Sequence, residues 1–354
     1  MKARLVALVG VVTGSAVFAA CLWGGAADAK PSAPQPPAVS AVTATPGTGA
    51  PSAASAAALP APSGDAPATR GPRPGAAVPD ETVTFCEPVD GVELQMDVYY
   101  PDGHTSTGEA PAVVYVHGGG WTSGSRSQGE GTRYISSLLQ GGFVVFAVDY
   151  RLSPEYLFPA HIQDVQCGIR HIRANADEYG IDPDRIGAIG GSAGGQLVNL
   201  LGTAEDGDFD LVGGYEGYSS EVSVVVSMFG ASDFSDPNMA GHNAAHTRVF
   251  GSADPYSEEL QAASAVNYVS SGDADFLLLH GEEDPVVPIS QSAIFEAALA
   301  TAGVDVTFIR VEHAGHSFAP TGGTPNPSAQ PARPDRRPVL QRPPVTRRRC
   351  REAG

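Results

Sequence analysis

Nearly continuous apolar runs recur along the middle of the chain, separated by stretches whose apolar residues have helical spacing. Apolar residues that follow one another without polar alternation indicate strands covered on both faces. The runs lie at residues 112–120, 143–151, 185–191, 222–233, 275–284 and 306–313. Helices are predicted between them, at residues 133–140, 161–179, 196–203 and 289–302. This alternation predicts an α/β fold with a mostly parallel, doubly wound central sheet and helices on both faces.

Ahead of these runs, the apolar residues follow a different pattern. Residues 92–100 are apolar at every second position, and they follow the run TVTFC across a Pro-Val-Asp-Gly turn. Strict alternation on both sides of a short turn predicts an antiparallel hairpin at the start of the domain.

Unusual residues gather where the predicted strands end. The first of four such loops is HGGGW, His117 to Trp121, and the others contain Ser192, Asp284 and His316. The carboxyl ends of parallel strands share one edge of the sheet, so these loops are expected to meet there.

Ser192 stands in the sequence Gly190-Gly191-Ser192-Ala193-Gly194, between a predicted strand and a predicted helix. This is a G-x-S-x-G nucleophile elbow, in which glycines are needed because larger side chains would collide where the strand turns into the helix. Ser192, Asp284 and His316 follow in the chain order of α/β-hydrolase triads. They are predicted to be the nucleophile, the acid and the base.

Several motifs carry a resemblance to a known family over roughly residues 83–320. They are VYVHGGGW, VDYRLSPEYLFPA, DPDRIGAIGGSAGG, HGEEDPVVP and HAGHSF. With them the chain resembles α/β-hydrolase esterases, close to the hormone-sensitive-lipase group and to polysaccharide acetyl and feruloyl esterases. Gly191 departs from the lipase group, which usually has Asp there, and is more typical of the polysaccharide esterases and formamidases.

The resemblance implies an α/β-hydrolase fold, with no metal and no organic cofactor. It also implies an oxyanion hole made by the backbone N–H groups of Gly119, Gly120 and Ala193. Tyr156 and Phe158 are expected to cover the substrate pocket together with an insert, residues 233–264, that is interpreted as a lid or irregular cap. Trp121 is either a pocket wall or a packed core aromatic.

Rival residues exist for these roles. Asp233 ends a predicted strand where some hydrolases keep their acid, and His313 lies close to His316. His242 and His246 raise the possibility of a metal site, but no HExxH-type helix accompanies them, so none is predicted. His117 is expected to order the glycine loop rather than to catalyse.

The ends of the chain have a different composition. Residues 1–29 begin with two basic residues, continue with an apolar stretch and end in Ala-Asp-Ala, which predicts a secretory signal peptide. The alternatives are lipidation at Cys21 and an uncleaved membrane anchor, and each of the three implies export. Residues 30–80 are Ala- and Pro-rich and predict a disordered linker before a hydrolase domain at residues 81–320. Residues 321–354, rich in Pro and Arg, predict a disordered basic tail in place of the final helix of the fold.

The net charge limits the kinds of binding partner, and the cysteine content limits the possible disulfides. The formal net charge is −18 although the last 34 residues hold eight Arg, so the domain itself is strongly acidic. That argues against nucleic acid and leaves a membrane tether only at the N-terminus. Beyond the signal peptide the cysteines are Cys86, Cys167 and Cys350. A Cys86–Cys167 disulfide is predicted because both lie in the exported domain, the alternative being two buried free thiols.

Together these features predict an exported serine carboxylic-ester hydrolase. Its substrate is expected to be a short-chain small-molecule ester or a polysaccharide-linked ester. The alternatives are an amidase or formamidase of the same fold and a non-catalytic binding protein that keeps the hydrolase fold.

Overall fold

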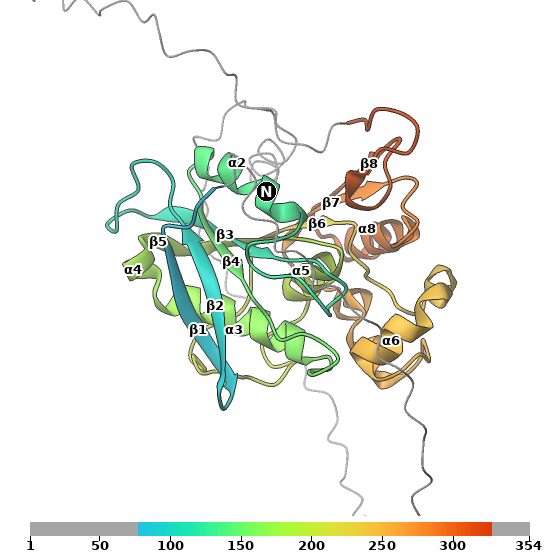
Figure 1. Ribbon diagram of the computed structural model, residues 1–354, viewed down its shortest axis with the longest axis horizontal. Coiled ribbons are helices and arrows are strands. Elements are labelled where there is room, and N and C mark those ends of the chain that lie inside the picture. Colours follow the sequence, from blue (N-terminus) through green and yellow to red (C-terminus); the bar gives the residue numbers. More distant parts are fainter. Residues whose placement is uncertain (1–76, 328–354) are drawn as a thin grey trace, which may run out of the picture.

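The computed structural model describes residues 77–327, which form one eight-stranded sheet with helices on both faces (Figure 1). The strand order is β1-β2-β4-β3-β5-β6-β7-β8. β1 and β2 form the predicted antiparallel hairpin, β2 is antiparallel to β4, and all pairs from β4 to β8 are parallel. The strands are β1 (Glu81–Val89), β2 (Val92–Tyr99), β3 (Ala110–Val116), β4 (Val144–Val148), β5 (Ile181–Gly191), β6 (Val224–Met228), β7 (Asp275–Gly281) and β8 (Val306–Val311).

Side chains that alternate along the central strands enter two separate hydrophobic clusters. On β3, Val114 and Val116 face one cluster, while Val113 and Tyr115 face the other. The α-helices are α2 (Ile135–Gln140), α3 (Ala160–Ala174), α4 (Ala176–Tyr179), α5 (Ala193–Thr203), α6 (Asn243–Phe250), α7 (Glu258–Ala262) and α8 (Ser290–Ala302). The 3₁₀ helices are η1 (Glu130–Arg133), η2 (Pro237–His242), η3 (Ala265–Tyr268) and η4 (His316–Phe318).

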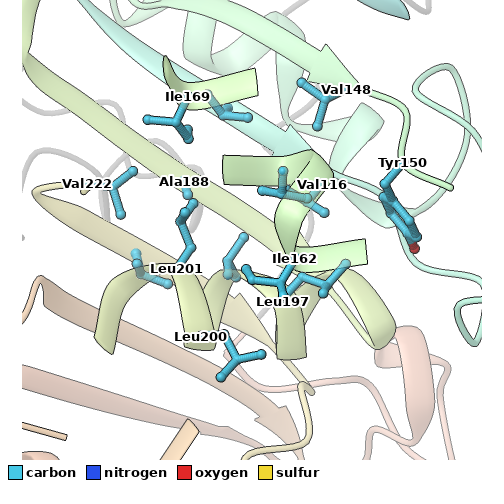
Figure 2. Close-up of a cluster of buried hydrophobic side chains, with 14 of the residues drawn as sticks. Val116, Val148, Tyr150, Ile162, Ile169, Ala188, Leu197, Leu200, Leu201 and Val222 are labelled. Carbon is cyan, nitrogen blue, oxygen red and sulfur yellow. The ribbon is translucent and has the colours of Figure 1, made fainter. Parts of the chain in front are cut away.

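The larger cluster lies beneath α3 and α5. Figure 2 shows Ile162 and Ile169 of α3 and Leu197 of α5 around the sheet residues Val116 and Ala188. All five are almost fully buried, as expected for strands that carry no polar face. On the opposite face, α2 supplies Ile135 and Leu138, and η4 supplies Phe318. This packing holds β5 from both faces and α5 against one of them, and so fixes the turn between the two.

The insert at residues 233–264, interpreted as a lid or irregular cap, contains helices, so only the expectation that it is irregular is wrong. It contains η2, α6 and α7. α6 ends at Gly251, which takes a left-handed conformation with φ 80°, and α7 begins after Ser257, whose side chain accepts a hydrogen bond from Leu260 N–H. Figure 1 shows α6 at the periphery of the molecule. These helices are too short for a periodic pattern to reveal them.

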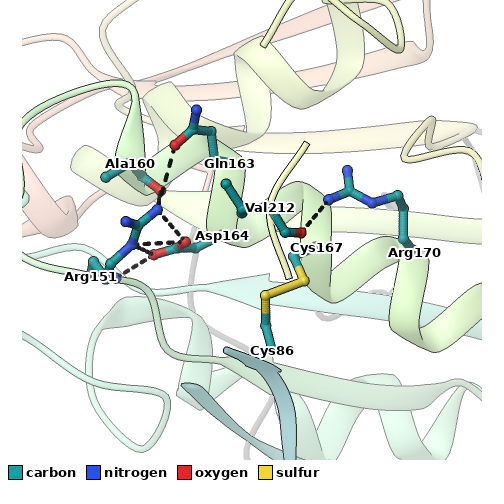
Figure 3. A network of polar contacts seen from close by, with 8 residues as sticks. All are labelled: Cys86, Arg151, Ala160, Gln163, Asp164, Cys167, Arg170 and Val212. Atoms are coloured by element: carbon teal, nitrogen blue, oxygen red, sulfur yellow. Dashed lines mark hydrogen bonds and ion pairs between the residues drawn. A yellow bond between two sulfur atoms is a disulfide. The ribbon is translucent and has the colours of Figure 1, made fainter. Parts of the chain in front are cut away.

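The expected cysteine pair is joined in the structure. Cys86 of β1 and Cys167 of α3 form a disulfide with a Cα–Cα distance of 6.3 Å (Figure 3). Both are almost fully buried, partly beneath Gly213, where an added Cβ would overlap both sulfurs. The bond ties the edge strand to a helix of the main core. In the same view, Arg151 forms a buried ion pair with Asp164 of α3, with 2.8 Å between Arg151 Nη2 and Asp164 Oδ1.

The folded part continues beyond residue 320, so the predicted start of a disordered tail at 321 is wrong. Asn326 and Glu312 exchange two backbone hydrogen bonds of 2.9 and 3.1 Å, and Thr321 N–H donates to His313 O. Residues 319–326, called the strap below, therefore run back along the loop that carries His316. Within residues 77–327, η4 is the last helical segment.

Several predictions concern residues outside the described range. These are the signal peptide at residues 1–29, the alternative lipidation at Cys21, the linker up to residue 76 and the tail from residue 328. Between residues 77 and 327, no helix combines the length and apolar character needed to cross a membrane.

Candidate active site

The backbone at Ser192 turns sharply between β5 and α5. Ser192 has φ 58° and ψ −120°, a conformation that non-glycine residues rarely adopt. Its N–H donates to Met228 O at 3.0 Å, and its carbonyl accepts from Gln196 N–H. An added Cβ at Gly190 or Gly194 would collide with neighbouring backbone, which explains the glycines of the motif. This is the geometry predicted for a nucleophile elbow.

Three side chains predicted to act together form a hydrogen-bonded chain. His316 Nε2 lies 3.1 Å from Ser192 Oγ, and His316 Nδ1 lies 2.8 Å from Asp284 Oδ2. The Asp284 side chain is fully buried and the His316 side chain is 20% exposed. The His316 side chain therefore reaches the surface, whereas that of Asp284 is shielded from water.

The carboxylate of Asp284 is held by more than His316. Its Oδ1 accepts from the N–H groups of Val286 at 2.8 Å and Val287 at 3.0 Å. His280 Nε2 lies 3.5 Å from Oδ2. Burial alone would raise the pKa of Asp284, but hydrogen bonds from His280 and His316 outweigh it and hold the pKa well below its usual value. The group is thus ionised throughout the neutral range.

The rival residues occupy other positions. Asp233 accepts hydrogen bonds from the backbone N–H and the hydroxyl of Ser235, whereas Asp284 is the carboxylate bonded to His316. The rings of His242 and His246 stack with centroids 5.9 Å apart. In the part of the chain that the structure describes, no group of three His, Cys, Asp or Glu residues could hold a metal ion.

The glycine loop after β3 lies against Ser192. An added Cβ at Gly118 would come within 3.4 Å of Ser192 Cβ, and Gly119 and Gly120 have φ values of 121° and 61°. Ala193 is the first residue of α5, where a backbone N–H has no acceptor within the helix. Ala193 thus follows Ser192 in sequence, and Gly119 and Gly120 follow Gly118, which lies against Ser192.

His117 orders this loop, as predicted. Its Nδ1 is 2.7 Å from Gly118 O, and its ring stacks on Tyr150 with centroids 4.1 Å apart. The Tyr150 hydroxyl donates to His117 O at 2.9 Å. Burial lowers the pKa of His117, so the ring is neutral and acts as a packed hydrogen-bonding group.

The three predicted pocket residues differ in burial. Trp121 is half-buried, donates from Nε1 to Gln196 Oε1 at 3.0 Å and packs edge-on against Phe250 of α6. Tyr156 is also half-buried and lies 5.3 Å from the Arg151 guanidinium. Phe158 belongs to the hydrophobic core and contacts Phe250, and its position at the pocket stays a prediction.

Comparison with known proteins identifies the family. The model of the BD-FAE family matches residues 96–299, a stretch longer than half of the chain. The chain belongs to the BD-FAE family. Among curated relatives of this BD-FAE member, Esterase LipQ of Mycobacterium tuberculosis is 33% identical over 234 residues, which are 64% of this chain and 55% of the relative. Esterase LipC of the same organism is 35% identical over 219 residues, 60% of this chain and 54% of the relative.

The chain spans about half the length of these curated relatives. Among solved structures, the apo form of Thermogutta terrifontis esterase 2 has a TM-score of 0.59 and 26% identity, covering 71% of this chain and 88% of that one. A butyrate-bound structure of a Thermogutta terrifontis esterase, Est2, also has a TM-score of 0.59 and 26% identity, with 68% and 86% covered. The α/β-hydrolase fold and the esterase resemblance predicted from the motifs are both confirmed.

Two residues of this BD-FAE site were not predicted. Phe229 follows β6 with φ 42°, and its ring lies 4.7 Å from the ring of His316 and 5.0 Å from Phe318. An added Cβ at Gly191 would come within 3.2 Å of the Phe229 ring. Glycine in place of the usual Asp at position 191 leaves room for the Phe229 ring, so this departure was the signal in the sequence that could have pointed to Phe229. The other residue is His280, which shares the loop HGEED with Asp284.

Proposed function

We propose that this BD-FAE family member is an exported serine carboxylic-ester hydrolase that acts on short-chain or carbohydrate-linked esters. The observation that carries the proposal is the hydrogen-bonded chain from Ser192 Oγ through His316 to Asp284, at a backbone turn with positive φ. Relatives named as esterases support the reaction class. A butyrate-bound and a propionate-bound structure of the similar Thermogutta terrifontis esterase support short acyl groups.

The reaction begins with Ser192. A serine hydroxyl is a poor nucleophile at neutral pH, so His316 Nε2 accepts its proton as Oγ attacks the ester carbonyl. Asp284 keeps the imidazole in the tautomer with a proton on Nδ1 and stabilises the imidazolium that forms. The low pKa of Asp284 keeps the carboxylate ionised for this task.

The attacked carbonyl oxygen becomes an oxyanion. The N–H groups of Gly119, Gly120 and Ala193 receive it, which in related systems contributes about 3–4 kcal/mol per donor. His316 then protonates the leaving alcohol, and the acyl group remains on Ser192. Water attacks this acyl-enzyme with His316 again as the base and releases the acid. The protein contributes side chains and backbone groups to this cycle, and water is the second reactant.

The first test is hydrolysis of p-nitrophenyl acetate and butyrate by the full chain beside Ser192→Ala. Turnover by the wild type that falls at least about 10³-fold in the variant is expected if Ser192 is the nucleophile. Ser227→Ala is a matched control, because it removes a buried hydroxyl on β6 that bonds Gly195 O. No turnover by folded wild-type protein would contradict the proposal and favour a binding role.

An amidase or formamidase is the second candidate, favoured by Gly191 in place of the usual Asp. Acyl-matched substrates separate the two. The esterase proposal predicts faster turnover of phenyl formate and acetate than of formanilide and acetanilide by the same protein. A preference for the formyl amide would assign the formamidase activity instead. Secretion is tested by locating the mature protein and determining its first residue.

A further inference from the structure

A second histidine lies behind the acid of the triad. His280 is near the end of β7, four residues before Asp284, and is completely buried. Its Nδ1 lies 2.8 Å from Ser292 Oγ, and its Nε2 lies 2.8 Å from Val287 O. The same Nε2 is 3.5 Å from Asp284 Oδ2. The mechanism given above does not use this residue.

The neighbours of His280 determine where its proton is. A backbone carbonyl can only accept, so Nε2 carries a hydrogen and donates it to Val287 O. That N–H also faces Asp284 Oδ2. On the other side of the ring, Nδ1 shares a hydrogen bond with the hydroxyl of Ser292. Ser292 is buried in the first turn of α8, so a helix of the scaffold determines the orientation of the ring.

His280 approaches the same oxygen of Asp284 that His316 contacts. Asp284 Oδ2 accepts the hydrogen bond from His316 Nδ1, whereas Oδ1 is held by two backbone N–H groups. His280 Nε2–H therefore lies next to Oδ2, beside the N–H of His316. The same group donates to the carbonyl of Val287, and the N–H of Val287 donates to Oδ1. Rotation of the carboxylate away from His316 would weaken both contacts.

We propose that His280, oriented by Ser292, is a positioning residue that holds the Asp284 carboxylate in line with His316. The inference rests on the proposed serine-hydrolase function. It extends the triad into a buried chain from Ser192 to His316, Asp284, His280 and finally Ser292 on α8. His280 touches neither the substrate nor the reacting atoms, so its effect passes through Asp284.

The test compares His280→Leu, His280→Gln and Ser292→Ala in the full chain. Leu removes both ring nitrogens, and kcat is expected to fall about 10- to 100-fold with KM changed less than about 2-fold, because outer-shell partners typically have effects of this size. The amide N–H of Gln can still reach Val287 O and Asp284, so this variant is expected to recover most of kcat. Ser292→Ala leaves the imidazole in place and removes only the hydrogen bond that orients it, so kcat is expected to fall less than in His280→Leu, by about 3- to 10-fold.

A matched control separates the specific role of His280 from the general effect of removing a buried histidine. His171 of α3 is also buried, and its ring nitrogens share hydrogen bonds with the hydroxyls of Tyr179 on α4 and of Tyr215. His171→Leu is therefore expected to leave kcat within about 2-fold. A second readout is the low-field proton resonance of His316 Nδ1–H, identified by its absence in Asp284→Asn. This resonance should move upfield in His280→Leu and remain near its wild-type position in His280→Gln.

The outcomes separate the inference from the function. Turnover that is lost in Ser192→Ala establishes the reaction, and the His280 variants then decide the positioning role. If the wild type has no turnover, the proposed function fails, and the resonance alone tests whether His280 orders the Asp284–His316 contact. An unchanged resonance and unchanged kcat in His280→Leu would overturn the inference, as would equal losses in the Leu and Gln variants.

Discussion

At the scale of single residues, Asp284 is distinguished from Asp233 by its environment. Asp284 is fully buried, bonded to His316 and surrounded by N–H donors, whereas Asp233 bonds Ser235. Asp284→Asn is expected to lower kcat about 10⁴-fold, because the amide favours the wrong imidazole tautomer and cannot stabilise the imidazolium. Asp233→Asn is the matched control and should retain at least about half of kcat. Steady-state kinetics on p-nitrophenyl acetate measures both, and equal losses would contradict the assignment of the acid.

Gly191 leaves room for the ring of Phe229 because it has no side chain. Its φ is not positive, but an added Cβ would come within 3.2 Å of the Phe229 ring that packs against His316. Gly191→Ala is therefore expected to lower the free energy of unfolding by about 1–3 kcal/mol through overpacking, and to lower kcat. Phe229→Leu in the same chain should relieve part of the strain. Urea unfolding of the two single variants and the double variant gives the coupling free energy, and strictly additive effects would be evidence against this contact.

At the scale of elements, the strap, residues 319–326, was not predicted from the α/β-hydrolase motifs. Residues 319–326 pair with residues 312–315, and Thr321 also bonds the side chain of Glu283, next to Asp284. A chain that ends after Pro320 is expected to lose at least about 10-fold in kcat, since the loop carrying His316 would lose its paired partner. A chain that ends after Pro327 is the matched control and should retain wild-type kcat. Equal activity of the two truncated chains would remove any role of the strap.

Elements that depend on particular residue types within a short stretch of chain could be predicted from the sequence. The elbow at Ser192 needs its glycines and the parallel strands need unbroken apolar runs, so both were predicted correctly. The helix α6 was missed because eight residues with little amphipathic pattern resemble a loop. The contributions of Phe229 and His280 come from contacts with η4, with the loop after β7 and with α8. Such contacts between elements far apart in the chain leave no periodic signal.

At the scale of the whole molecule, the disulfide joins the edge hairpin to the main core. Cys86 and Cys167 are 81 positions apart, so the bond closes a long loop in the unfolded chain. Loss of the bond in a Cys86→Ser/Cys167→Ser variant is expected to lower the free energy of unfolding by about 2–4 kcal/mol. Activity at 25 °C should change little, because the bond lies on β1 and α3, away from the loops that carry the triad. Urea unfolding with and without reductant measures the effect, and reductant should leave the variant unchanged.

Buried histidines predict how the stability of the whole domain depends on pH. Burial lowers the pKa of His161, His171 and His246 to about 4 each, whereas the unfolded chain titrates them near 6.5. Between these values the unfolded state binds more protons, so the free energy of unfolding must fall as the pH drops from about 6.5 to about 4. Each histidine contributes up to about 3 kcal/mol to this loss. Asp284 adds to the loss mainly below about pH 4, because its pKa is lowered in the folded state and the unfolded chain therefore binds its proton first.

Set against a typical total stability of about 5–15 kcal/mol, the loss from three such groups is a large fraction of the free energy of unfolding. Burial raises the pKa of Asp164, which opposes the trend, so one histidine must be isolated by comparison. His171→Gln keeps a polar side chain between Tyr179 and Tyr215 but removes the titrating ring. The difference in unfolding free energy between pH 7 and pH 5 should then be smaller in this variant than in the wild type. Urea unfolding at both pH values measures it, and parallel pH dependences would show that His171 does not contribute to the acid sensitivity.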